Sequence, residues 1–248
     1  AEVGQGLATI GVTIEGRYSG DNRFATAREI YLGNDGWGNL AIIASGANFA
    51  DACTVAPIAF SEKAPLFLVD ANGMLDNESK ALIASADFEN LLIIGGTSAV
   101  SQDVEDWTVD LGYRLGEIIG TDENQGESYE RQVEGAARVV FRIEGSNRYW
   151  TSAALANWAI DNLGYTREGT AVATGSNFPD ALCGGYMQGK RKSVLLLSDT
   201  GREEACGIVA STAVTDTGTM KPETLIYLGG EAALPRSARA AITDVLMG

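Results

Sequence analysis

The sequence predicts an α/β fold made of two tandem layered α/β repeats with mainly parallel sheets. Short apolar runs without polar alternation are separated by stretches with helical spacing, which is typical of strands covered on both faces of a parallel sheet. The same motifs also occur twice along the chain, in the same order. This self-similarity indicates the duplication of one unit of roughly a hundred residues.

Three pairs of motifs define the duplication. They are GDNRFAT (20–26) with GSNRYWT (145–151), ASGANFADA (44–52) with ATGSNFPDA (173–181), and IGGTSAVS (94–101) with LGGEAALP (228–235). We therefore divide the chain into four parts: an N-terminal strand segment (1–16), a first repeat (17–113), an acidic linker with a strand (114–141) and a second repeat (142–248).

The first copy has three uninterrupted apolar runs, at 40–44, 65–69 and 91–95, and each predicts a buried strand. A helix is predicted after the second motif, because apolar residues recur there at helical spacing: Phe49, Ala52, Cys53, Ala56 and Phe60. Pro57 is expected to kink this helix, since proline removes a backbone donor and its ring crowds the preceding turn.

The second copy repeats these elements, with strands predicted at 170–174, 194–198 and 225–229. The helix after its first motif carries an apolar stripe with spacings of three and four residues: Tyr149, Ala153, Ala156, Ile160 and Leu163. Residues 114–135 are acidic and poor in large apolar groups, so we expect a solvated connection. The segments 8–15 and 138–144 precede the GxNR motifs, and each is expected to add a strand to its own unit.

Composition narrows the classes of function. The formal net charge of −15 over 248 residues argues against nucleic-acid binding, which requires a basic face. No apolar run is long enough to cross a bilayer, and Ala1 does not begin a signal peptide, so no membrane insertion is expected. The chain has no histidine, no G-x-S-x-G motif and no cluster of metal ligands in the sequence, so we expect no catalytic residues and no resident metal.

The three cysteines do not suggest a disulfide framework. Cys53 and Cys183 follow the repeated aspartates and are interpreted as small buried thiols on helices. A disulfide between Cys183 and Cys206 is compatible with the sequence.

Most repeated polar residues have a structural explanation. In the ASGANFADA pair, asparagine caps a helix and aspartate complements its dipole; anion binding is the less favoured reading, because the aspartate would repel the anion. The double glycines are read as tight turns and carry only a weak hint of phosphate binding. The residues interpreted in this way are Asn22, Asn48, Asp51, Gly95, Gly96, Asn147, Asn177, Asp180, Gly229 and Gly230.

The candidate ligand-binding residues are basic. Arg23 and Arg148 are suited to bidentate binding of a phosphate or carboxylate, although pairing with Asp51 and Asp180 of their own copies is the favoured reading. The densest basic segment is Lys190, Arg191 and Lys192. A solvated loop is the default reading of that segment, but it is also where so acidic a chain could most easily meet a polyanion.

The four motifs GxNR, ASGxNFxDA, the leucine-rich strand and IGGTxAVS, in this order and twice over, resemble the cell wall-binding repeat 2 family. The resemblance covers residues 17–113 and 142–248. It implies Rossmann-like or Toprim-like repeats in a secreted, surface-attached protein of a Gram-positive bacterium, bound to an anionic secondary cell wall polymer or to peptidoglycan. The family's polymer-linked leucine motif falls at 66–68 and 195–197, which we expect to be buried strand cores.

We therefore expect a non-catalytic cell wall-binding module that uses Arg23, Arg148 and Lys190 to Lys192. Because protein and polymer are both acidic, Ca2+ or Mg2+ is expected to bridge them. The family commonly packs three repeats around a pseudo-threefold axis and this chain shows two, so a homo-oligomer is compatible with the resemblance. Two other classes stay open: an enzyme acting on a phosphorylated or nucleotide-like ligand at the strand-to-helix turns, and an S-layer-like structural or adhesion protein.

Overall fold

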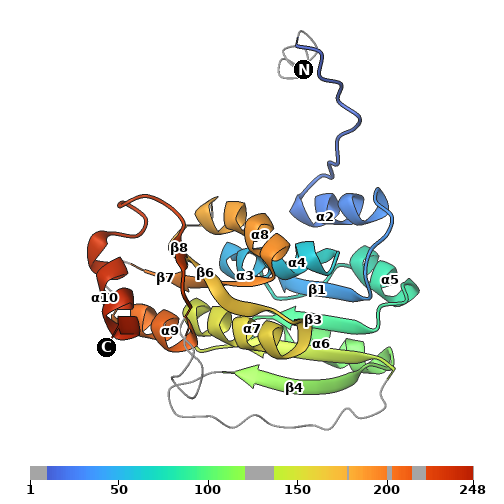
Figure 1. Ribbon diagram of the computed structural model, residues 1–248. Coiled ribbons are helices and arrows are strands. Elements are labelled where there is room, and N and C mark those ends of the chain that lie inside the picture. The colour runs from blue at the N-terminus through green and yellow to red at the C-terminus, as the bar shows by residue number, and fades with distance from the viewer. Residues whose placement is uncertain (1–9, 121–136, 178, 200–202, 214–221, 248) are drawn as a thin grey trace.

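The computed structural model describes residues 10–120, 137–177, 179–199, 203–213 and 222–247. Two parallel sheets with helices packed against them form the described molecule (Figure 1), which confirms the layered α/β prediction. The first sheet has five strands in the order β2-β1-β3-β5-β4, and the second has three in the order β7-β6-β8. Every strand pair in both sheets is parallel.

The elements of the first unit follow the predicted alternation. They are α2 (Arg23–Leu32), β1 (Leu40–Ser45), α3 (Phe49–Thr54), α4 (Ala56–Ser61), β2 (Leu66–Val69), α5 (Asn77–Ser85), β3 (Asn90–Ile94), α6 (Gln102–Asp110) and β4 (Arg114–Gly120). Instead of one helix kinked at Pro57 there are two short helices: α3 ends at Thr54, and Pro57 lies in the first turn of α4.

The second unit repeats this alternation after β5 (Val139–Glu144). Its elements are α7 (Arg148–Leu163), β6 (Thr166–Thr174), α8 (Pro179–Arg191), β7 (Ser193–Ser198), α9 (Glu203–Ala213), β8 (Leu225–Tyr227) and α10 (Arg236–Met247). Asparagines begin the equivalent helices of the two units. Asn22 accepts a hydrogen bond from the backbone of Ala25, and Asn147 accepts from Tyr149 and Trp150.

Three expectations about the flanking segments were wrong. The strand at 139–144 does not join the second unit; β5 inserts into the first sheet between β3 and β4. Residues 114–120 form strand β4, and only the rest of the expected linker lies outside the described residues. Residues 10–15 form no strand, and residues 8 and 9 lie outside the described part of the chain.

The position of β5 follows from its side chains. Val139, Val140 and Ile143 are buried between the sheet and its helices, while Arg142 forms an ion pair with Glu105 of α6. These contacts exist only in the first sheet, because Glu105 belongs to the helix that follows β3.

One apolar core runs through both units. It joins Ile42 and Ile94 of the first sheet to Trp158 of α7 and to Val172 and Leu196 of the second sheet. The helices α4 and α8 also pack together at this junction, where glycines allow a close approach. A Cβ added at Gly189 would lie 2.5 Å from the carbonyl oxygen of Pro57.

The cysteines and leucine motifs follow the predictions only in part. All three cysteines are free thiols; Cys53 is buried as expected, but Cys183 is exposed on the outer side of α8. Leu195, Leu196 and Leu197 are buried, and so is Phe67. Leu66 and Leu68 are only half-buried, because in the described structure they line an apolar cavity of about 450 Å3 beside α2.

Candidate functional site

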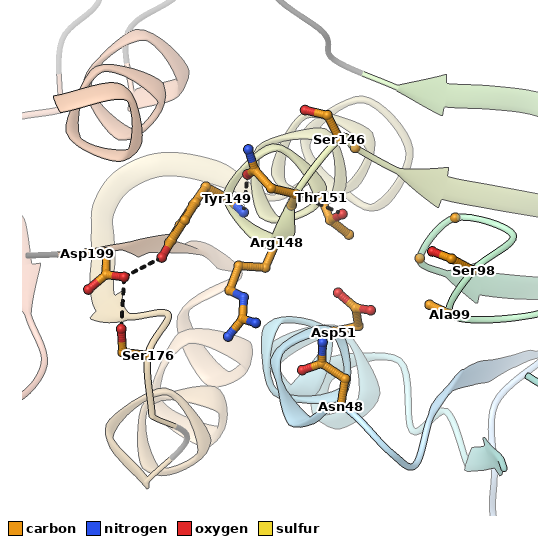
Figure 2. Close-up of a pocket in the computed structure, with 14 residues that line it drawn as sticks. Asn48, Asp51, Ser98, Ala99, Ser146, Arg148, Tyr149, Thr151, Ser176 and Asp199 are labelled. Carbon is orange, nitrogen blue, oxygen red and sulfur yellow. Dashed lines mark hydrogen bonds between the residues drawn. The ribbon is translucent and has the colours of Figure 1, made fainter. Parts of the chain in front are cut away.

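A cavity of about 520 Å3 lies where the two units meet, and we call it the junction pocket (Figure 2). Both copies contribute to its lining. The lining residues are Asn48, Asp51, Gly95, Gly96, Ser98, Ala99, Gly145, Ser146, Asn147, Arg148, Tyr149, Thr151, Ser176 and Asp199.

The topology explains why these residues meet. Asn48 and Asp51 follow β1, the Gly95 turn follows β3, and the Gly145 turn follows β5. Since β1, β3 and β5 are neighbouring parallel strands, the turns after them meet at one edge of the sheet. Ligands of open α/β sheets bind at this carboxyl edge.

Asp51 is the buried acid of the pocket, with 7% of its surface exposed. Burial raises its pKa to about 6, and the nearby positive charge of Arg148 acts in the opposite direction. Gly95, with φ of +104°, leaves room for this carboxylate, because a Cβ there would lie 2.9 Å from Asp51 Oδ2. The first glycine of the pair therefore packs closely against the aspartate.

Arg148 enters the pocket from the start of α7 and faces Asp51 (Figure 2). Its guanidinium donates a hydrogen bond of 2.5 Å to the carbonyl of Gly175 and lies 5.8 Å from the ring centre of Phe49. The ring contact with Phe49 and the electrostatic interaction with Asp51 both cross from the second copy to the first.

This arrangement corrects the favoured pairing of each arginine with the aspartate of its own copy. Within the described residues, neither Arg23 with Asp51 nor Arg148 with Asp180 forms an ion pair. Arg148 lies near Asp51 because β5, the strand that leads into α7, belongs to the first sheet, and it donates its hydrogen bond to the turn glycine of its own copy, Gly175. Arg23 donates to the carbonyl of Gly46.

The opposite wall of the pocket is fixed by Asp199, which follows β7. Its Oδ2 accepts hydrogen bonds from Tyr149 Oη at 2.7 Å and from Ser176 Oγ at 2.8 Å. On the near side, the backbone N–H groups of Gly96 and Ser98 donate no hydrogen bond within the described residues. The pocket thus combines one cation and available amide donors with buried acceptors, a set suited to hydroxyl-rich ligands that also carry negative charge.

The other basic candidates lie elsewhere. The basic segment 190–192 lies at the C-terminal end of α8, at the opposite edge of the sheet from the start of that helix. Since α8 has 13 residues, its two ends are about 20 Å apart. Lys192 reaches across the junction to Glu62 at 3.1 Å. Arg23 lines the apolar cavity beside Leu66 and Leu68. The structure therefore places the basic candidates in three separate locations.

Sequence reasoning missed part of the pocket. Asp51, Gly95 and Gly96 were assigned structural roles only, and Ser98, Ser176 and Asp199 were not singled out. Their common signal is their position directly after a predicted strand. Among the described residues, no three acidic or cysteine side chains gather closely enough to hold a metal ion. No helix in the described ranges is long and apolar enough to cross a membrane.

Comparison with known proteins gives a family match to both copies. The family model "Cell wall binding domain 2 (CWB2)" matches residues 17–105 and 142–239. The chain is 32% identical over 105 residues to the N-acetylmuramoyl-L-alanine amidase LytC of Bacillus subtilis. This alignment covers 42% of the chain and 21% of LytC. It is 30% identical over 173 residues to the amidase enhancer of Bacillus subtilis, covering 69% of this chain and 20% of that protein.

Two solved structures have a similar fold. Cwp8 from Clostridium difficile superposes with a TM-score of 0.69 at 23% identity, over 99% of this chain and 36% of Cwp8. Cwp6 from Clostridium difficile gives a TM-score of 0.67 at 22% identity, over 92% of this chain and 31% of Cwp6. The chain spans about a fifth of the length of the two curated relatives and about a third of these two structures.

Proposed function

This chain belongs to the cell wall binding domain 2 family, whose members are cell wall binding modules, and we propose that it binds an anionic wall polymer at the junction pocket. One observation carries the proposal: repeated motifs from both copies, around Asp51 and Gly95 in the first and around Arg148 in the second, line the same cavity although they are far apart in sequence. A module of this kind would attach a secreted protein to the outside of the cell without catalysing a reaction on the wall.

The lining suggests how a polymer would be recognised. Arg148 and the free amides of the Gly96 turn would donate to phosphate, carboxylate or hydroxyl oxygens. Asp51 would accept from a sugar hydroxyl. Since the chain carries a net charge of −15, we also propose that Ca2+ or Mg2+ bridges its acidic surface to the polymer.

Co-sedimentation with cell walls tests the proposal. The purified chain is mixed with Bacillus subtilis and Clostridium difficile walls, before and after hydrofluoric acid strips the anionic polymers. We expect sedimentation with at least one native wall and its loss after stripping. Absence of sedimentation with both native walls would contradict the proposed function.

Matched arginine variants locate the site. Arg148→Gln should weaken wall binding about tenfold or more, since it removes the pocket's cation. Arg236→Gln is the control, because that side chain is 88% exposed on α10 and distant in sequence from the pocket motifs. Equal affinity of the two variants would place the polymer elsewhere, and a Lys190→Gln, Arg191→Gln double variant would then test the far edge of α8. EDTA should weaken binding if divalent cations bridge the two surfaces.

A further inference from the structure

A buried ion pair holds strand β5 in the first sheet. Arg142, 3% exposed, donates through Nε to Glu105 Oε2 at 2.7 Å. The same guanidinium donates to the carbonyls of Gly95 and Val100 at 3.0 Å each. Arg142 lies opposite Ile93 in the β3–β5 register. The helix thus supplies the carboxylate of the pair, and the added strand supplies the cation.

The second unit has the equivalent surface without an added strand. Its strand β8 pairs only with β6 in the described part of the chain, so its outer edge is unpaired. Leu225, Ile226 and Tyr227 are all half-buried, whereas residues 91–94 of β3 are fully covered. An unpaired edge with partly exposed apolar side chains can accept another strand. The strand β8 and helix α10 lie at the end of the molecule away from α5 (Figure 1).

The helix beside β8 carries a cation at the position where the helix beside β3 carries an acid. Glu105 lies ten residues after the first glycine of its double-glycine turn, and the residue at the same distance in the second copy is Arg239. Arg239 lies on α10, as Glu105 lies on α6, and it donates to Glu231 at 3.3 Å. Its Nε is buried and has no acceptor in the described structure. An unpaired buried donor of this kind is unfavourable until an acceptor arrives.

The chain's own N-terminal segment does not complement this edge. Arg17 precedes its GxNR motif by the same distance as Arg142, and it is exposed to solvent. A strand from a second copy, added in the register of β5, would bring Arg17 against Arg239. Two cations in a buried position would repel each other, so the edge discriminates against this chain's own segment.

We propose that the β8 edge binds an extended segment of a partner that carries a carboxylate opposite Tyr227, so that this acid pairs with Arg239. The helix then supplies the cation and the strand supplies the acid, the reverse of the Arg142–Glu105 pair. Backbone hydrogen bonds to β8 would give affinity, and the acid would give selectivity. This docking edge is separate from the junction pocket and does not depend on the proposed polymer binding.

Peptides derived from β5 test the proposal with the whole chain. One fluorescent peptide has the sequence of residues 138–145, and its pair carries Arg142→Glu. Binding is measured by fluorescence anisotropy. We expect the Glu peptide to bind the wild-type chain about tenfold or more tightly than the Arg peptide. In a chain with Arg239→Glu, the preference should reverse.

A matched variant tests whether the peptide preference depends on Arg239 at the β8 edge. Arg236→Glu is the matched variant, because Arg236 also pairs with Glu231 but points into solvent, and it should leave the preference for the Glu peptide unchanged. Circular dichroism checks that each variant folds. Failure of the Glu peptide to bind the wild-type chain, or a preference that does not change in Arg239→Glu, would overturn the proposal.

Discussion

At the scale of single residues, Asp51 is the side chain of the junction pocket whose pKa is shifted by burial. Its carboxylate is buried beside Arg148, and its pKa is raised from 3.8 to about 6. Between these two values the folded protein holds a proton that the unfolded chain has lost. Its contribution therefore makes the free energy of unfolding rise as the pH falls from 7 to 4.

Asp51→Asn should remove this pH dependence. At pH 7 the wild-type charge costs on the order of 3 kcal/mol, so the Asn variant should be the more stable by up to that amount. Near pH 4 the two proteins should converge. Urea unfolding at both pH values measures the difference. A gap that stays constant with pH would mean that the carboxylate is compensated in the folded protein.

The partners of individual residues were the part of the site that the sequence could not predict. Asp51, Gly95 and Arg148 were all recognised as repeated residues, but their partners were assigned within one copy. The crossing of Arg148 to Asp51 depends on β5 entering the first sheet, and no local pattern encodes which sheet a strand joins. Periodicity predicts that 139–144 is apolar and extended, and it does not predict the neighbour of that segment.

At the scale of elements, the junction between α4 and α8 depends on small residues. Gly185 and Gly189 face α4 so closely that an added Cβ would lie 2.6 Å from Ala56 Cβ and 2.5 Å from the Pro57 carbonyl oxygen. The first copy has the larger Ala56 and Phe60 at the equivalent positions, 129 residues earlier, so the second copy has lost side-chain bulk here. Close helix packing explains it.

Gly189→Ala should therefore destabilise the protein by about 1–3 kcal/mol, because the backbone of α4 cannot move away without disturbing the junction. Gly207→Ala in α9 is the matched control. No atom lies within 4 Å of an added Cβ there, so this change should stabilise the helix by about 0.5–1 kcal/mol. Thermal unfolding of both variants distinguishes the two effects. Equal melting temperatures would show that α4 and α8 are not tightly packed.

The strand β5 depends on its ion pair in the same way. Glu105→Gln leaves the Arg142 guanidinium buried without its carboxylate, and we expect a loss of about 3–5 kcal/mol of stability. Glu105→Gln combined with Arg142→Met should recover much of this loss, since the buried charge is gone. Urea unfolding of the single and double variants measures the recovery. A double variant no more stable than the single one would contradict this account of the pair.

At the scale of the whole molecule, the fold class, the duplication and the six strands predicted within the repeats followed from apolar runs and repeated motifs. The relation between the units did not. A shared core and an exchanged strand join them, so the two repeats are not structurally independent of each other. Such an arrangement leaves one edge, β8, with the features of an acceptor and one exposed segment, around Arg17, with the features of a donor.

The charge at these two surfaces decides whether copies of the chain can join. If a second wild-type copy added its N-terminal segment to β8, its Arg17 would face Arg239 and repel it, so self-association through this edge is disfavoured. Arg239→Glu restores the arrangement of the Arg142–Glu105 pair and should turn the chain into a head-to-tail assembly at high protein concentration. Sedimentation velocity at increasing concentration measures this. Adding Arg17→Glu to that variant should abolish the assembly, because two acids then face each other; an assembly that persists would have to form through a different surface.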